Sequence, residues 1–390
     1  MQEGSLSGRL WPIHIKPKPD ELLSSWLARL SMAHGLKLHT FCSIAWPRKP
    51  IWNRDIDKCA NAEMVRVLSE KTATPAGRVR ATTLSAYEDV LYERYNYFGP
   101  TPWIMPVGVY HRTRCRFGLQ YCPRCLSEDK EPYYRRRWRL AFMVLCERHQ
   151  ALLLDRCPQC GVPVNFHRDE LGNFHKLVAV SLTRCHGCGS DLCTAVAKDS
   201  HARVTPAEAE FISGLLQTMD TGFVRVGECV VTYSHLYFTV LRQLMKILAM
   251  RNKRIGKLRE AISEAYGVES YVPPLSRTHP DVQELGVHAR RQLLGLARCL
   301  LEDWPYRFTE FSIKYKIWSS LWLRHLEPCA RDQARTAPFW FWSVVREHLY
   351  RARYCPSDEE TAAATRYLKQ NGGVLNKSKL ARLLGVAVVR

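Results

Sequence analysis

This 390-residue sequence contains pairs of cysteine and histidine residues whose spacing is typical of metal ligands. Two residues separate the members of each pair, and this spacing lets a tight turn direct both side chains at one metal ion. Gly161 and Gly189 directly follow two of the pairs, where glycine accepts the positive φ that such a turn needs. The pairs are Cys122 and Cys125, Cys146 and His149, Cys157 and Cys160, and Cys185 and Cys188.

Eight ligands predict two tetrahedral zinc sites with no coordination position left for water, which is typical of structural zinc. Sequential pairing would join the first two pairs and the last two, and a cross-brace arrangement stays open. The sequence holds 15 cysteines, so seven lie outside the pairs and are predicted to be packed thiols. If one of the eight paired residues is not a ligand, Cys193 or His186 is the residue that we consider in its place.

Motifs for enzymatic chemistry are incomplete. The segment 372–378 has Asn376 where a phosphate-binding loop needs its second glycine, which disfavours an NTPase. Neither a G-x-S-x-G nor an H-E-x-x-H motif occurs. Asp55 and Asp57 could hold Mg²⁺ in a nuclease, but Arg54 adjoins them. We therefore favour helix capping or ion pairing for the two carboxylates and predict that the protein is not an enzyme.

The charge balance indicates a polyanionic partner. Lysine and arginine number 57 against 37 acidic residues, a net charge of +20, and each phosphate contact in nucleic acid requires a cation. A solvated basic face is the alternative at each candidate position. The candidate contacts are Arg78, Arg80, Arg135, Arg136, Arg139, Arg251, Lys253 and Arg254.

Apolar spacing predicts a mainly α-helical fold, with helices over 22–34, 36–45, 62–71 and 75–84 in the N-terminal part. The last two, joined by a three-residue turn, have the spacing of a helix-turn-helix unit, and Thr82 and Thr83 could contact bases. The segment 133–145 is predicted to be a helix with Trp138 on its buried face. Further helices are predicted over 206–219, 233–250, 255–266, 281–302, 309–326, 339–354 and 358–370.

These elements suggest five regions. We expect a helical domain over 1–98, a connector rich in proline and glycine over 99–118, a double zinc module over 119–200 and a helical domain over 201–356. The segment 357–390 resembles the beginning of a helix-turn-helix unit and is apparently incomplete. No apolar run reaches the length that spans a bilayer, and residues 1–9 have no signal-peptide stretch, which predicts a cytoplasmic protein without a membrane partner.

Several motifs occur in a defined order over about half of the chain, residues 10–190. They begin with Leu10-Trp-Pro12 and Pro19-Asp-Glu-Leu-Leu-Ser-Ser-Trp-Leu27, and continue through Trp52-Asn-Arg-Asp-Ile-Asp57. Further along are Phe117–Leu126, Trp138, the C-x-x-H pair at 146–149 and Cys157–Gly161. Taken together, these motifs resemble the TnsD/TniQ family of Tn7-like and mercury-resistance-type transposons, and the resemblance is strongest across the second group.

The resemblance implies a non-catalytic target-selection factor for DNA transposition. Such a protein connects a target recogniser to the AAA+ ATPase that recruits the transposase. The recogniser is either DNA-binding or an RNA-guided CRISPR effector such as Cascade, and the protein is often a dimer. From the residues alone, a zinc-containing transcription regulator and a Mg²⁺-dependent nuclease stay open as alternatives.

Overall fold

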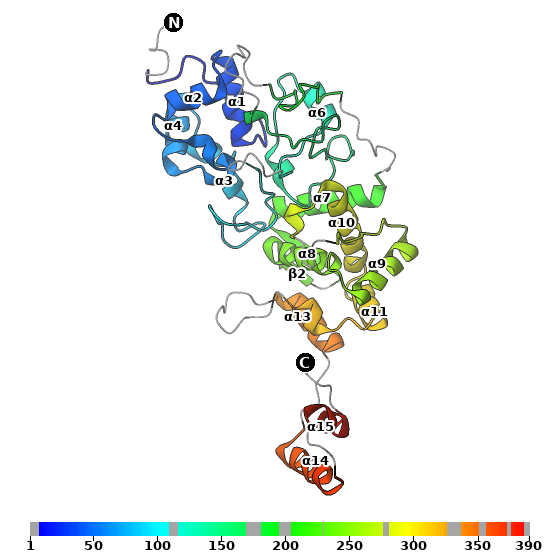
Figure 1. Cartoon of the computed structure of the whole chain (residues 1–390). Coiled ribbons are helices and arrows are strands. Elements are labelled where there is room, and N and C mark those ends of the chain that lie inside the picture. The colour runs from blue at the N-terminus through cyan, green and yellow to red at the C-terminus, as the bar shows by residue number, and fades with distance from the viewer. Residues whose placement is uncertain are drawn as a thin grey trace.

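The computed structural model describes residues 8–108, 116–168, 181–194, 204–228, 230–275, 281–324, 326, 337–350, 356–372 and 376–385. Within these residues the fold is mainly helical, as predicted, and its one sheet is a two-stranded hairpin. Figure 1 shows the N-terminal helices beside the α6 region, with α7–α13 packed below both and α14 and α15 at the far end. No helix in this part of the chain is long and apolar enough to cross a membrane.

The N-terminal helices pack around Trp26 and Leu27, which are fully buried in α1. Helix α4 begins where predicted, because the side chain of Asn61 accepts a hydrogen bond from the backbone of Met64. The elements are α1 (Leu23–Ala33), α2 (Leu38–Ala45), η1 (Ile51–Asn53), α3 (Ile56–Cys59), α4 (Ala62–Thr72), α5 (Ala76–Arg80) and η2 (Leu84–Tyr87).

Helix α5 is shorter than predicted for the second helix of a helix-turn-helix unit. It spans Ala76–Arg80, and the chain turns inward after it. Thr82 and Thr83 are buried, and their hydroxyl groups donate to the carbonyls of Val79 and Arg80. The prediction that these threonines contact bases is therefore wrong, because both hydroxyls are used inside the fold.

The middle region contains little regular structure. Its elements are α6 (Pro123–Glu128), η3 (Arg136–Arg139) and η4 (Phe166–Arg168). The predicted helix over 133–145 does not form. Instead, Leu22 donates its N–H to the carbonyl of Tyr134, and Ala141 donates its N–H to the carbonyl of Trp103. Hydrogen bonds to distant segments thus override the helical pattern of this sequence.

The second half is a helical region with a core along α8 and α10. Helix α7 begins with the capping box of Thr205 and Glu208. The elements are α7 (Pro206–Thr221), β1 (Phe223–Val226), β2 (Val230–Tyr233), α8 (Ser234–Leu248), α9 (Lys253–Tyr266), η5 (Val282–Glu284), α10 (Val287–Leu301), α11 (Tyr306–Lys314), α12 (Ser319–Trp322), α13 (Phe339–Leu349), α14 (Asp358–Gln370) and α15 (Lys377–Leu383).

Buried contacts cross the predicted boundaries on both sides of the connector. Trp103 is fully buried, its indole N–H donates to the carbonyl of Phe238, and its ring packs on Phe142 and Phe238. Arg290 of α10 is also fully buried and donates to the carbonyl of Ala141 and to the side chain of Gln120. The N-terminal, middle and α7–α13 regions therefore share one continuous core.

Candidate metal centres

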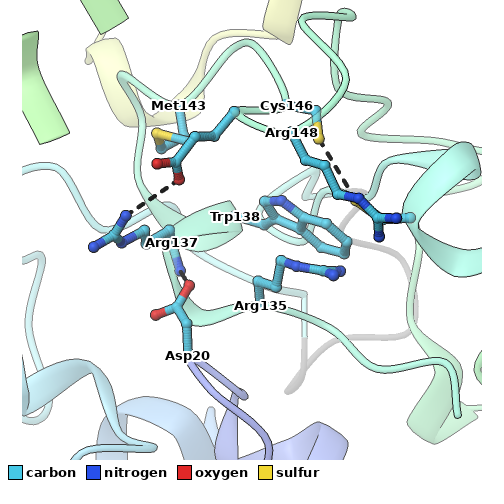
Figure 2. Close-up of a pocket in the computed structure, with 9 residues that line it drawn as sticks. Asp20, Arg135, Arg137, Trp138, Met143, Cys146 and Arg148 are labelled. Carbon is cyan, nitrogen blue, oxygen red and sulfur yellow. Dashed lines mark hydrogen bonds and ion pairs between the residues drawn. The ribbon is translucent and has the colours of Figure 1, made fainter. Parts of the chain in front are cut away.

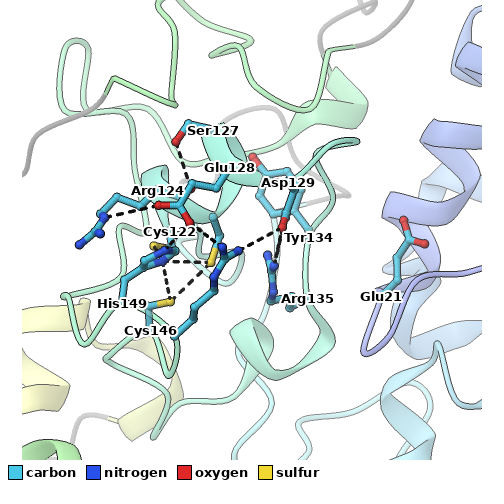
Figure 3. Close-up of polar contacts among 12 residues, drawn as sticks. Glu21, Cys122, Arg124, Ser127, Glu128, Asp129, Tyr134, Arg135, Cys146 and His149 are labelled. Atoms are coloured by element: carbon cyan, nitrogen blue, oxygen red, sulfur yellow. Dashed lines mark hydrogen bonds and ion pairs between the residues drawn. The ribbon is translucent and has the colours of Figure 1, made fainter.

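The first cluster gathers Cys122, Cys125, Cys146 and His149, and its ligand atoms all lie within 4.8 Å of one another (Figure 3). Nδ1 of His149 lies 3.3 Å from the sulfur of Cys122, 3.3 Å from that of Cys125 and 3.5 Å from that of Cys146. In a tetrahedral zinc site with Zn–S bonds of about 2.3 Å, neighbouring ligand atoms are about 3.5–3.8 Å apart. The cluster therefore fits one zinc ion.

The second cluster gathers Cys157, Cys160, Cys185 and Cys188. The sulfurs of Cys157 and Cys188 are 3.7 Å apart, and those of Cys160 and Cys185 are 3.6 Å apart. Cys157 and Cys185 are buried, whereas Cys160 and Cys188 are exposed. The Ser190 hydroxyl lies 3.2 Å and 3.1 Å from the sulfurs of Cys157 and Cys188, where it can donate to a thiolate.

The grouping follows the sequential pairing and not the cross-brace arrangement that the spacing left open. Cys193 and His186, the two substitutes considered above, lie outside both clusters. Three cysteines with one histidine, and four cysteines, are sets that hold zinc in closed structural sites. The arrangement can stabilise the middle region by metal binding, and it leaves no ligand position for a reacting water.

Three of the four ligand pairs sit in the same backbone turn. In each, the N–H of the fourth residue after the first ligand donates to that ligand's carbonyl at 2.8 Å. This donor residue has a positive φ, +73° at both glycines and +47° at the glutamine. The pair at 122–125 differs, because Cys122 directly precedes α6 and Pro123 occupies the first helical position. The three turns are Cys146–Gln150, Cys157–Gly161 and Cys185–Gly189.

Glu128, which the sequence did not single out, supports the first cluster. Its Oε2 lies 3.0 Å from Nε2 of His149, and it also pairs with Arg148 at 2.7 Å. The hydrogen bond from His149 lowers the pKa of the Glu128 carboxyl. A carboxylate on Nε2 fixes the tautomer that leaves Nδ1 free to bind a metal. An acidic residue close to a predicted ligand was the only sequence signal for this role.

Arg139 corrects the predicted nucleic-acid patch. Its side chain is fully buried, so it is not on a surface that a nucleic acid could contact. Its guanidinium donates to Asp55 at 2.5 Å, to Asp57 at 3.1 Å and to the carbonyl of Met105 at 2.8 Å. The expected placement on a solvated helix face is wrong, because the helix that would have exposed this residue does not form.

The ion pairs with Arg139 also explain the roles of Asp55 and Asp57, the two carboxylates that were considered as Mg²⁺ ligands. Asp57 is buried and accepts hydrogen bonds from the backbone N–H and the hydroxyl of Ser24, at 2.7 Å and 2.9 Å. Burial and the neighbouring Asp55 raise the pKa of Asp57 to about 7, against the effect of Arg139. Because Arg139 lies between both acids, they form an internal ion-pair network, as the ion-pairing interpretation predicted.

Arg135 and Arg136 also have acidic partners. Arg135 pairs with Asp129 at 3.0 Å, and its guanidinium stacks 4.7 Å from the centre of the Trp138 ring. Arg136 lies 3.3 Å from the carboxylate of Asp20, and its backbone N–H donates to the carbonyl of Asp20. The contacts of Arg136 attach the middle region to the N-terminal part, and at both arginines a nucleic acid would have to compete with an existing ion pair.

Figure 2 shows a pocket of about 320 Å³ beside the first cluster. Arg137 lies on one side, where its backbone N–H donates to Asp20 and its guanidinium pairs with Glu147 and Asp220. Arg148 lies on the other side, and Trp138 lies between them. We call residues 135–139 the arginine segment, and its members connect the metal cluster, the N-terminal helices and α7.

The other predicted nucleic-acid contacts lie on the surface. Arg78 and Arg80 project from α5, and a second group lies at the start of α9. Some of these guanidiniums donate to backbone carbonyls, including Arg78 to Pro17 at 3.0 Å. The second group consists of Arg251, Lys253 and Arg254, which are all exposed.

The fold and its clusters define a mainly helical protein with two candidate structural zinc centres, the first built into the core that the N-terminal helices share. Residues 12–153 match the family described as TniQ, a range that runs from the first helices through the first cluster. Residues 12–153 therefore form a TniQ domain, and the resemblance inferred from the motifs is confirmed over this range. The family is associated with target selection in DNA transposition. A search of curated proteins gives no match.

Proposed function

We propose that this protein is a non-catalytic targeting adaptor, which links a target-site recogniser to the AAA+ ATPase regulator of a DNA transposase. The observation that carries the proposal is the TniQ match over 12–153, a range whose N-terminal helices and first cluster contribute to one hydrophobic core. Asp55 and Asp57 of its N-terminal helices are joined to Arg139 by buried ion pairs. Two closed metal centres and a net charge of +20 support a role in binding.

The recogniser in this proposal is DNA itself or an RNA-guided CRISPR effector such as Cascade. DNA is a polyanion and the CRISPR effector carries RNA, so either recogniser would attract the excess of basic residues in this chain. A homodimer would present the basic surfaces twice. The surface that we assign to the ATPase is the N-terminal helices, and in particular the exposed Arg78 and Arg80 of α5.

The surface should be tested with point variants, because a deletion of residues 1–98 would remove the partners of Arg139 and Arg136. Arg78→Glu combined with Arg80→Glu should abolish capture of the AAA+ regulator of the same transposition system, measured with nucleotide and DNA present. Arg251→Glu with Arg254→Glu, at the start of α9, is the matched control and should capture the ATPase normally.

The adaptor function itself is tested by mapping transposon insertions in cells. Loss of the chain should abolish insertion at the chosen target, while the purified transposase keeps its strand-transfer activity. Full-length protein that never binds an AAA+ partner, with or without DNA, would contradict the proposal. Binding to a palindromic operator with control of a nearby promoter would instead support a transcription regulator.

A further inference from the structure

The hairpin of β1 and β2 presents an exposed face that carries aromatic side chains. Its register pairs Phe223 with Tyr233 and Arg225 with Val231. Alternate residues of a strand share a face, so these four side chains lie together. Phe223, Val231 and Tyr233 are 50%, 62% and 56% exposed, and Arg225 is exposed as well.

The opposite face and the tip hold the hairpin in place. Val226 and Thr232 are buried on the inner side, where the hairpin packs against α7 and α8. At the tip, Gly227 has a φ of +61°, and a Cβ there would lie 2.6 Å from the carbonyl oxygen of Trp304. Just after β2, the hydroxyl of Ser234 donates to the carbonyl of Val90. The exposed rings are therefore presented on a fixed support.

The aromatic rings form a row across this face and onto α8. The ring centres of Phe223 and Tyr233 are 4.9 Å apart, and those of Tyr233 and His235 are 6.0 Å apart with an angle of 25° between the planes. We name Phe223, Arg225, Val231, Tyr233 and His235 the aromatic face. Exposed aromatic side chains that lie together, and not singly, are a feature of interaction surfaces.

The charge of the aromatic face favours an anionic ligand. Arg225 makes no ion pair among the described residues, and its guanidinium lies 3.5 Å from the backbone carbonyl of Glu228. The carboxylate of Asp220, close by in sequence, is taken by Arg137. Exposed rings beside an uncompensated guanidinium are the combination that binds single-stranded nucleic acid, by base stacking and phosphate contact.

We propose that the aromatic face binds single-stranded nucleic acid, with bases stacked on Phe223 and Tyr233 and a phosphate held by Arg225. The inference rests on the proposed function, in which the protein has a nucleic-acid partner. It adds that this partner is single-stranded and that the aromatic face is the site that binds it. A peptide strand would instead pair along a free edge of the hairpin, so the exposed rings would contribute little to it.

The test measures binding of fluorescent oligothymidine and oligouridine to the full-length, zinc-loaded protein. Phe223→Ala and Tyr233→Ala should each weaken binding about tenfold, because the loss of base stacking on one aromatic ring lowers the affinity by about that factor. Tyr233→Phe should bind like the unmodified protein because the ring is kept. Arg225→Gln should weaken binding and reduce the slope of log affinity against log salt by about one phosphate contact.

Two matched controls exclude a general loss of aromatic or basic surface. Tyr306→Ala removes another ring that is 70% exposed, and Lys130→Gln removes another exposed cation, so both should bind normally. Unchanged affinity of both ring variants would overturn the inference. So would a change in their oligomeric state or peptide binding with no change in oligonucleotide binding. If these variants lose single-strand binding but still capture the ATPase, the two surfaces are separate and the proposed function stands.

Discussion

At the residue scale, Glu128 accepts a hydrogen bond from Nε2 of His149 and so favours the tautomer whose Nδ1 can bind a metal ion in the first cluster. Replacing Glu128 with Ala removes the acceptor on Nε2, so we expect zinc affinity at this site to fall about 10- to 100-fold. Glu128→Gln keeps an acceptor oxygen and should lose less. The measurement is competition with a chromogenic chelator, which follows release of the ion directly.

Lys130→Gln is the control for Glu128, because it changes an exposed charge on the same surface. It should leave the zinc affinity unchanged. Equal zinc affinity for Glu128→Ala and the unmodified protein would show that the hydrogen bond at 3.0 Å does not support the ligand.

Arg139 is the residue whose loss should cost most stability. Arg139→Met would leave Asp55 and Asp57 without their shared cation in the interior, and breaking a buried pair in this way costs about 3–5 kcal/mol. We expect a corresponding fall in the free energy of unfolding, measured in urea with zinc present. Arg80→Met, on the surface, should change it by less than about 0.5 kcal/mol.

Asp57 makes stability depend on pH. Its pKa is raised from 3.8 to about 7 in the folded protein, so the unfolded chain loses this proton first as the pH rises. The contribution of Asp57 is therefore most favourable below pH 4 and is lost between about pH 4 and pH 7. Asp57→Asn should abolish this dependence.

The measurement is the difference in unfolding free energy between Asp57→Asn and the unmodified protein from about pH 5 to pH 8. Because both proteins carry the same zinc ligands, metal-linked effects largely cancel in this difference. The variant should gain stability relative to the unmodified protein as the pH rises to 7. A difference that is constant with pH would contradict the raised pKa.

At the element scale, the turns and helices that form through residues close together in sequence could be predicted from the sequence. The spacing of Cys157 and Cys160 acts over a few residues, and the turn forms. The helix predicted over 358–370 also forms as α14, where Ser357 and Glu360 make a local capping box. The helix over 133–145 failed because its backbone bonds to segments that are distant in sequence. The burial of Arg139 has the same origin, since its acidic partners Asp55 and Asp57 lie more than 80 residues away.

The turns of the second cluster depend on their glycines. Gly161 and Gly189 have a φ of +73°, and a Cβ at either position would meet no atom within 4 Å. The cost of Gly161→Ala is thus conformational, about 1–2 kcal/mol for a left-handed alanine. We expect a lower melting temperature with the zinc content unchanged. Gly161→Asn should cost less because asparagine tolerates this region better, and Gly77→Ala in α5, where φ is ordinary, should cost nothing.

At the scale of the whole molecule, the two clusters differ in how much of the folded structure we expect to depend on metal binding. The first is buried and shares the core of the N-terminal helices, whereas Cys160 and Cys188 of the second are exposed. Elemental analysis should find two zinc ions per chain. Cys188→Ser should leave one zinc and a folded protein, while Cys125→Ser should unfold the TniQ region as well. Equal damage from both variants, seen by circular dichroism, would contradict this ranking.

The ligands of the first cluster enclose a stretch of chain that holds the arginine segment. Twenty residues, 126–145, lie between Cys125 and Cys146, and a metal ion held by this cluster would join the two ends of the loop. Closing the loop beforehand lowers the entropy that is lost when its arginines find their partners. Without zinc, the same loop offers a run of arginines to trypsin-like proteases. Zinc supply would then decide whether a newly made chain survives, since cleavage there separates the N-terminal helices from the rest of the protein.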